Sequence, residues 1–119
     1  MLICQAVTYK SLIYNVYRLQ HNHKLQVLFL RANNINDDDV KQICHVLKPD
    51  PTNPNFANKT LKVLDISYNP ITDHSVKYIA DMLENNRTLE YLGLAKCNLE
   101  NEHIIPILNQ IGRLPFPND

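Results

Sequence analysis

Residues 61–71, LKVLDISYNPI, carry the pattern that decides the fold. Leu61, Leu64 and Ile66 are separated by three and then two positions, and Asn69 and Ile71 follow. A helix repeats its apolar positions every three or four residues, and a half-buried strand repeats them every second residue. The spacing here fits neither. It indicates a short strand at 63–65 between two turns, all placing aliphatic side chains in one interior.

The same pattern occurs twice more. A shift of 28 residues brings it onto LEYLGLAKCNL (89–99), and a shift of 36 onto LQVLFLRANNI (25–35). Asn33 and Cys97 then occupy the position of Asn69. An asparagine amide can donate to and accept from backbone groups of adjacent turns of the chain. We therefore expect Asn33 and Asn69 to be buried and hydrogen-bonded, with Cys97 as a small, weakly polar substitute.

The longer period of the first copy has one cause. Eight extra residues fall within KPDPTNPNF (48–56), whose three prolines cannot continue a helix. We expect this segment to project with little internal structure. A shift of 64 also aligns residues 11–22 with 75–86. One repeat domain thus covers 1–119: a partial repeat (1–24), a repeat with the inserted loop 49–56 (25–60), a repeat (61–88) and a terminal repeat (89–119).

Between the predicted strands, the apolar period becomes that of amphipathic helices. Asp37, Asp73 and Asn101 stand where N-caps are needed. The predicted core-facing stripes are Val40, Ile43, Cys44 and Leu47; Val76, Ile79, Ala80 and Leu83; and Ile104, Ile107, Leu108 and Ile111. The first stripe, Leu12, Asn15, Val16 and Leu19, is degraded by Asn15.

The motif LxxLxLxxN/CxL with a 28-residue period resembles the ribonuclease-inhibitor-like class of leucine-rich repeats. The resemblance covers nearly the whole chain. It implies an α/β fold, a short segment of a right-handed horseshoe solenoid with parallel strands on the concave side and helices on the convex side. One turn of such a solenoid, here called a coil, is stable only when stacked on its neighbours. Members of the class generally bind other proteins.

Composition narrows the function. Lys plus Arg and Asp plus Glu both number 12, so the chain has no electrostatic footprint for nucleic acid or an anionic membrane. No apolar run is long enough to span a bilayer, and MLICQAVTYK does not resemble a signal peptide. Cys4, Cys44 and Cys97 are odd in number and widely spaced, which disfavours disulfides or a zinc site. We expect a cytoplasmic protein, with the cytoskeleton or a cilium as alternative locations.

Residues that could carry chemistry have simpler interpretations. Asp37, Asp38 and Asp39 complement a helix N-terminus and lack the spacing of a calcium loop. His21 and His23 lie in a predicted turn without further ligands. The two glycines form no phosphate-binding loop. The sequons NKT (58–60) and NRT (86–88) recur because the repeat recurs. We predict no catalytic residue, metal or cofactor, and no enzymatic activity.

The remaining candidate is a surface. Alternate positions of each strand should face outward on the concave side. Val27, Val63 and Tyr91 would form a column there, which has the composition of a protein-binding patch, although branched and aromatic residues also simply favour strands. The candidate binding residues are Val27, Phe29, Arg31, Val63, Asp65, Tyr68, Tyr91 and Lys96.

We therefore expect a non-enzymatic protein-interaction module or scaffold subunit of a larger intracellular assembly. One alternative is an activator of a small GTPase, since one branch of this repeat class activates GTP hydrolysis on Ran. Another is a subunit of a ciliary, axonemal or actin-regulating complex. The repeat pattern begins inside a strand, at Leu2. We therefore also expect further repeats or a neighbouring subunit to cover the N-terminal edge.

Overall fold

The computed structural model describes residues 2–3, 16–17, 19–21, 23–53, 57–100 and 107. The strands are β1 (Leu2–Ile3), β2 (Val27–Phe29), β3 (Val63–Asp65) and β4 (Tyr91–Gly93). The helices are α2 (Asp37–Leu47) and α3 (Val76–Asn85), the latter preceded by a 3-10 turn, η1 (Asp73–Ser75). Several predicted positions lie outside the described residues: Leu12, Asn101, Ile104, Leu108 and Ile111.

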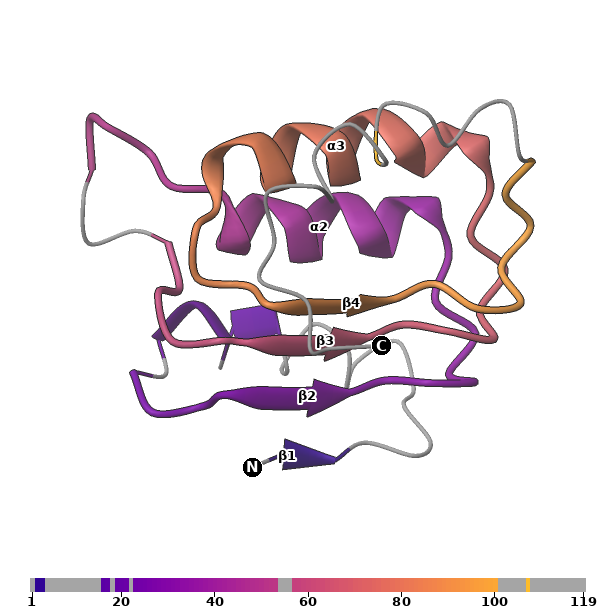
Figure 1. The fold of residues 1–119 in the computed structure, drawn as a ribbon, viewed down its shortest axis with the longest axis horizontal. Helices are drawn as coiled ribbons and strands as arrows, with labels where there is room; N and C mark the ends of the chain where they lie inside the picture. Colours follow the sequence, from indigo (N-terminus) through magenta and orange to yellow (C-terminus); the bar gives the residue numbers. More distant parts are fainter. Residues whose placement is uncertain are drawn as a thin grey trace.

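The four strands form one parallel sheet in chain order. Val27 pairs with Val63, and Val63 with Tyr91, so the predicted shifts of 36 and 28 residues are the observed registers. Helices α2 and α3 lie side by side on one face of the sheet (Figure 1). Parallel neighbours joined by a crossover helix follow the usual right-handed connection. The predicted α/β solenoid, with strands on one side and helices on the other, is confirmed.

The interior is filled by the predicted aliphatic residues. Leu28, Leu64 and Ile66 are almost fully buried, as are Val40, Ile43 and Leu47 from α2. Burying a side chain of this size contributes about 1.5–3 kcal/mol. Val46 and Met82 are buried too, although both lie off the predicted helix stripes. Ile107 is buried, in agreement with the prediction for the last repeat.

The helix caps differ from the prediction. Asn36, not Asp37, is the N-cap of α2: its side chain accepts from the Asp39 backbone N–H, and the Asp39 carboxylate accepts from the Asn36 N–H. This reciprocal capping box satisfies two helix-end donors. Thr72, not Asp73, caps η1. The prediction erred by one residue because Asn and Thr are also favoured N-cap residues.

The aspartates that follow these caps reach the next coil instead. The Asp37 carboxylate accepts from the Thr72 backbone N–H and from the hydroxyls of Thr72 and Ser75. Asp73 repeats the arrangement by accepting from the Glu100 N–H. Burial acts to raise the pKa of Asp37, but the hydrogen bonds from Ser75 and Thr72 outweigh it, so the pKa lies below its usual value. Each aspartate thereby links the start of its helix to the following coil.

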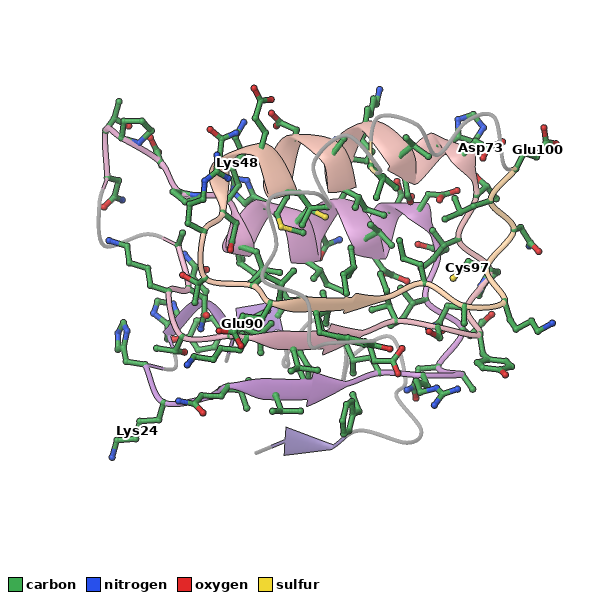
Figure 2. All side chains as sticks on the ribbon, in the orientation of Figure 1. Lys24, Lys48, Asp73, Glu90, Cys97 and Glu100 are labelled. Carbon is green, nitrogen blue, oxygen red and sulfur yellow. The ribbon has the colours of Figure 1, made fainter. Side chains whose placement is uncertain are left out.

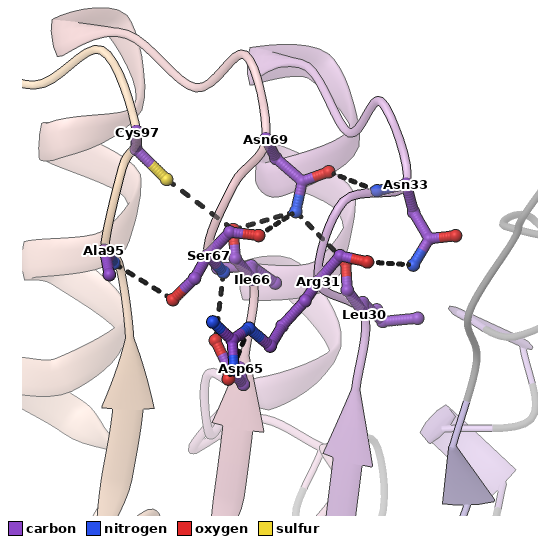
Figure 3. A network of polar contacts seen from close by, with 9 residues as sticks. All are labelled: Leu30, Arg31, Asn33, Asp65, Ile66, Ser67, Asn69, Ala95 and Cys97. Atoms are coloured by element: carbon purple, nitrogen blue, oxygen red, sulfur yellow. Dashed lines mark hydrogen bonds and ion pairs between the residues drawn. The ribbon is translucent and has the colours of Figure 1, made fainter.

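Asn69 forms the predicted ladder, here called the inner ladder. Its side chain is buried, and its Oδ1 accepts from the N–H groups of Asn33 and Ile35 in the preceding coil, both at 2.9 Å. Its Nδ2 donates to the carbonyls of Leu30, Ile66 and Ser67. In the next coil, Cys97 Sγ donates to the Ile66 carbonyl at 3.6 Å (Figure 3). Asn33 is buried at the equivalent position and donates to the Arg31 carbonyl.

A second ladder runs along the other end of the strands. Asn58 Nδ2 donates to the Leu19 carbonyl, while its Oδ1 accepts from the N–H groups of Thr60 and Leu61. Asn86 repeats this pattern, with Nδ2 on Leu47 O and Oδ1 accepting from Thr88 and Leu89. Each asparagine therefore holds the helix end of the preceding coil and the turn that enters the following strand.

The inserted segment leaves this framework undisturbed. In its described part, Pro51, Thr52 and Asn53 are exposed, and Figure 1 shows the connection between α2 and β3 extending away from the sheet. It has more internal order than predicted, since Asp50 accepts from the backbone and hydroxyl of Thr52. At its base, the Asn58 N–H donates to the Val46 carbonyl at 2.8 Å. The loop is thus closed where it leaves the repeat.

None of the helices in the described ranges is long and apolar enough to cross a membrane. Within those same ranges, no group of three or more His, Cys, Asp or Glu side chains is placed to hold a metal ion.

Candidate functional site

The outward face of the sheet carries a graded row of side chains. Val27, Val63 and Tyr91 are direct neighbours in the register of the sheet. The two valines are half-buried, as is Phe29, whereas Tyr91 is 44% exposed. An exposed aromatic ring beside half-buried aliphatic groups forms an apolar surface that a partner could cover. Val27, Val63 and Tyr91 are therefore adjacent along the sheet, and their role in binding stays a prediction.

The turns after the strands add polar and aromatic groups. Tyr68 is 49% exposed, and Arg31 and Lys96 are exposed as well. Ala32, Tyr68 and Lys96 occupy equivalent positions and share a left-handed backbone, with φ of 55°, 60° and 56°. A left-handed backbone costs a residue with a Cβ about 1–2 kcal/mol. The repeat geometry imposes this conformation, and at Tyr68 it displays a large ring at the end of β3.

Asp65 corrects the prediction. It was expected to be an exposed flank of the patch, but it is only 7% exposed. Its Oδ1 accepts from the Ser67 N–H at 3.0 Å, and its Oδ2 lies 3.4 Å from Arg31 Nε. Asp65 therefore cannot be a freely presented charge for a partner. Its buried carboxylate instead holds Ser67 and Arg31 in place.

Gly93 explains how Asp65 becomes buried. A Cβ at Gly93 would lie 2.3 Å from Asp65 Oδ1 and 2.7 Å from its Cγ, well inside contact distance. The absent side chain in β4 thus provides the space over which the carboxylate lies. Ser67, also buried, continues the network by accepting from the Ala95 N–H at 3.0 Å. Sequence reasoning assigned outward positions by strand alternation alone, so it missed the consequence of a glycine next to an aspartate in the register.

Arg31 is held between two neighbours, Asp65 and Tyr68. Besides its contact with Asp65, its guanidinium carbon lies 5.0 Å from the centre of the Tyr68 ring, within the range of a cation–π interaction. Figure 3 shows Arg31 reaching from its own coil to Asp65 in the next, below the inner ladder. The structure thus brings Arg31, Asp65 and Tyr68 together from two coils. Tyr91 belongs to the column with Val27 and Val63.

The two ends of the sheet differ in their polar groups. Figure 2 places Lys24 and Glu90 where the strands begin, and Asp73, Cys97 and Glu100 where they end. Arg31 and Tyr68 lie at the end where the strands finish, because they are in the turns that follow β2 and β3. There, Asp37, Asp39 and Asp73 already accept hydrogen bonds from backbone N–H groups. Their charges are therefore largely engaged in the fold.

The cysteines and sequons fit structural roles. Burial raises the pKa of the Cys44 thiol to about 12, with a smaller contribution from Asp81, so it stays protonated and unreactive. Burial also raises the pKa of Cys97. Asn58 and Asn86, the acceptor residues of the two sequons, are each 2% exposed, with their amide nitrogens donating to backbone carbonyls. The sequons are therefore part of the second ladder.

Comparison with known proteins agrees with this geometry. The Leucine Rich repeat family matches residues 21–44 and 57–80. Mouse NACHT, LRR and PYD domains-containing protein 4B is 30% identical over 84 residues, covering 71% of this chain and 9% of that protein. Human NACHT, LRR and PYD domains-containing protein 13 is 30% identical over 115 residues, covering 76% of this chain and 11% of that protein. The chain thus spans about a tenth of the length of these relatives.

Two solved structures share the fold. The leiomodin-1 actin-binding site 2 structure superposes with a TM-score of 0.66 at 21% identity, over 90% of this chain and 73% of that one. The C-terminal domain of Caenorhabditis elegans tropomodulin gives 0.67 at 13% identity, over 86% and 57%. The strand registers, the inner ladder and these matches define a leucine-rich-repeat fold. The chain belongs to the leucine-rich repeats of the ribonuclease-inhibitor-like class.

Proposed function

We propose that this chain is a non-enzymatic protein-interaction module, or a scaffold subunit of a larger intracellular assembly, which binds its partner through the concave face. The observation that supports this most is the exposure of Tyr68 and Tyr91 on one face, beside the half-buried valines and Phe29. Exposed aromatic rings next to an arginine have the composition of interface hot spots. Leucine-rich-repeat domains typically serve in protein interaction, which agrees with the proposal.

The proposed binding residues are those predicted from the sequence, with one change of role. Tyr91, Val63, Val27 and Phe29 form the apolar part, and Arg31, Tyr68 and Lys96 form the polar lip. Asp65 acts from beneath the surface, because its carboxylate is buried against Arg31 and Ser67. We propose a cytoplasmic location, with the cytoskeleton or a cilium as alternatives. The cytoskeletal alternative draws support from the fold shared with the leiomodin-1 actin-binding site 2 structure.

A test compares proteins captured by the parent chain with those captured by two double variants. Phe29→Ala with Tyr91→Ala removes the apolar column, and Lys41→Ala with Lys77→Ala changes exposed positions of the convex helices. We expect the concave variant to weaken binding of a captured partner tenfold or more, the order of a hot-spot loss. Thermal melting confirms that both variants are folded. Equal weakening by the convex variant would contradict the assignment of the face.

The alternatives have direct assays. An activator of a small GTPase would accelerate GTP hydrolysis when added to candidate GTPases at catalytic amounts. An actin-regulating subunit would co-sediment with filaments or change their polymerisation rate. The described residues carry no feature that favours either activity over partner binding, so both remain secondary proposals.

We also propose that β1, the first strand in the sheet order, is covered at its outer edge by further repeats or a neighbouring subunit. An open strand edge presents N–H and C=O groups that can pair with another strand. The much greater length of the curated relatives supports this proposal. Sedimentation of the purified chain tests it: association should rise with concentration, and a concentration-independent monomer would contradict it.

A further inference from the structure

Arg31 is an exposed side chain that is nevertheless fixed. Its side chain is 53% exposed, yet Asp65 holds the Nε end and the Tyr68 ring lies under the guanidinium carbon. Its backbone is fixed as well, because Asn33 Nδ2 donates to the Arg31 carbonyl at 2.9 Å. An arginine already ordered before binding loses less rotamer freedom when a partner arrives. Such a group is pre-organised for a ligand.

The contact with Asp65 leaves binding capacity unused. A guanidinium has five N–H donors in a planar fork, and the ion pair with Asp65 is made through Nε, at 3.4 Å from Oδ2. The Nη edge can therefore donate to a second planar acceptor, and carboxylates match its two-pronged geometry best.

A second exposed cation, Lys96, lies in the turn after β4, two coils beyond Arg31. Tyr68 and Lys96 occupy equivalent positions in adjacent coils, joined by the hydrogen bond from Tyr68 N–H to the Ala95 carbonyl. Neighbouring strands lie about 4.8 Å apart, so Arg31 and Lys96 flank Tyr68 within reach of one peptide segment. The acid that the structure places against the Arg31 guanidinium, within the described residues, is the buried Asp65, whereas the Arg31 and Lys96 side chains are exposed to a partner.

We propose that Arg31 and Lys96 bind carboxylates of an acidic protein segment, with the Tyr68 ring packing between them and Asp65 acting as the residue that positions Arg31. The proposal rests on the protein-binding function of the concave face and specifies the chemistry of its partner. An acidic segment satisfies both cations at once, whereas a neutral apolar segment would use only the Tyr91 column.

The probe is a short peptide of alternating glutamate and serine, titrated into ¹⁵N-labelled protein at low salt and followed by NMR. We expect shifts of the Arg31 Nε–Hε signal and of the Tyr68 and Lys96 amides. Arg31→Gln should weaken binding about tenfold, and Arg31→Lys about threefold or more, since a point charge replaces the fork. Asp65→Asn removes a negative charge, which alone would strengthen binding of an acidic peptide, so the weaker binding that we expect from this variant reports the lost positioning of Arg31. Lys77→Gln is the control, because it removes one positive charge on the convex face and should have no effect.

Each other outcome overturns the proposal. Absence of shifts at Arg31 at millimolar peptide, equal binding of the glutamine analogue of the peptide, or equal weakening by Lys77→Gln would each exclude carboxylate recognition at this lip. The proposed function can survive that result. If a captured partner depends on Tyr91 and Phe29 but not on Arg31, the concave face binds proteins without this acidic specificity. If the partner depends on none of them, the proposed function fails too.

Discussion

Replacing Asn69 by Ala tests the inner ladder most directly. The substitution removes Oδ1, the acceptor for the buried N–H groups of Asn33 and Ile35. Each buried donor left without a partner costs about 1–3 kcal/mol, so the expected loss is about 2–6 kcal/mol. The three carbonyls that accept from Nδ2 add less, because a carbonyl has a second lone pair. A domain of this size is stable by about 5–15 kcal/mol in total, so the loss is a large fraction.

Urea denaturation followed by circular dichroism measures the effect. Asn53→Ala is the matched control, because Asn53 lies exposed in the inserted loop and should change stability by less than about 0.5 kcal/mol. Asn69→Cys should fall between the parent and Asn69→Ala, since Cys97 already serves at the equivalent position through its Sγ donor. If Asn69→Ala unfolds at the same urea concentration as the control, the ladder contributes nothing and the reasoning is refuted.

Three other perturbations follow from the described contacts. Deleting residues 49–56 should change the free energy of unfolding by less than about 1 kcal/mol, because the Asn58–Val46 hydrogen bond closes the loop base; failure to fold would show that the loop packs on the core. Gly93→Ala should cost about 1–3 kcal/mol by displacing Asp65, and adding Asp65→Ala should recover most of it, which a double-mutant cycle measures. The lowered pKa of Asp37 means that its stabilisation is complete above the unfolded pKa of about 3.9 and is lost as pH falls through the folded value. Asp37→Asn should therefore reduce the acid dependence of stability below pH 4, and an unchanged dependence would count against this role.

The strands, their register and most of the core could be predicted from the sequence because leucine spacing determines them directly. Leu64 lies in the middle of β3 and Ile66 directly after it, so both side chains enter the same interior. The inner ladder followed from the same reasoning, since Asn69 recurs at a position that has no sheet partner. Asn58 and Asn86 also recur at equivalent positions. Their role was not predictable, because they bind carbonyls at the helix end of the preceding coil, and residue spacing within one repeat gives no information on contacts between coils.

The candidate surface was less predictable because it depends on contacts between coils. Alternation along one strand assigns Asp65 to the outward face, yet Gly93 in the neighbouring strand decides whether its carboxylate reaches solvent. Likewise, Asp37 was read as a cap for its own helix, whereas its partners Thr72 and Ser75 come from the next coil. Both errors arose from treating each repeat as if it ended at its own boundary.

The direction of the two asparagine ladders bears on how such a chain can change its length during evolution. Asn69 and Asn86 each serve the backbone of the coil before them, so a coil carries the groups that its predecessor needs. Duplication of a whole coil in the gene would therefore supply a matching set of contacts at the new junction. Duplication of half a coil would separate an asparagine from its acceptor. Insertions between Leu47 and Asn58 would escape this constraint, since the bonds of the second ladder are made on either side of the loop. The eight residues by which the 36-residue repeat exceeds the 28-residue repeat lie in this segment.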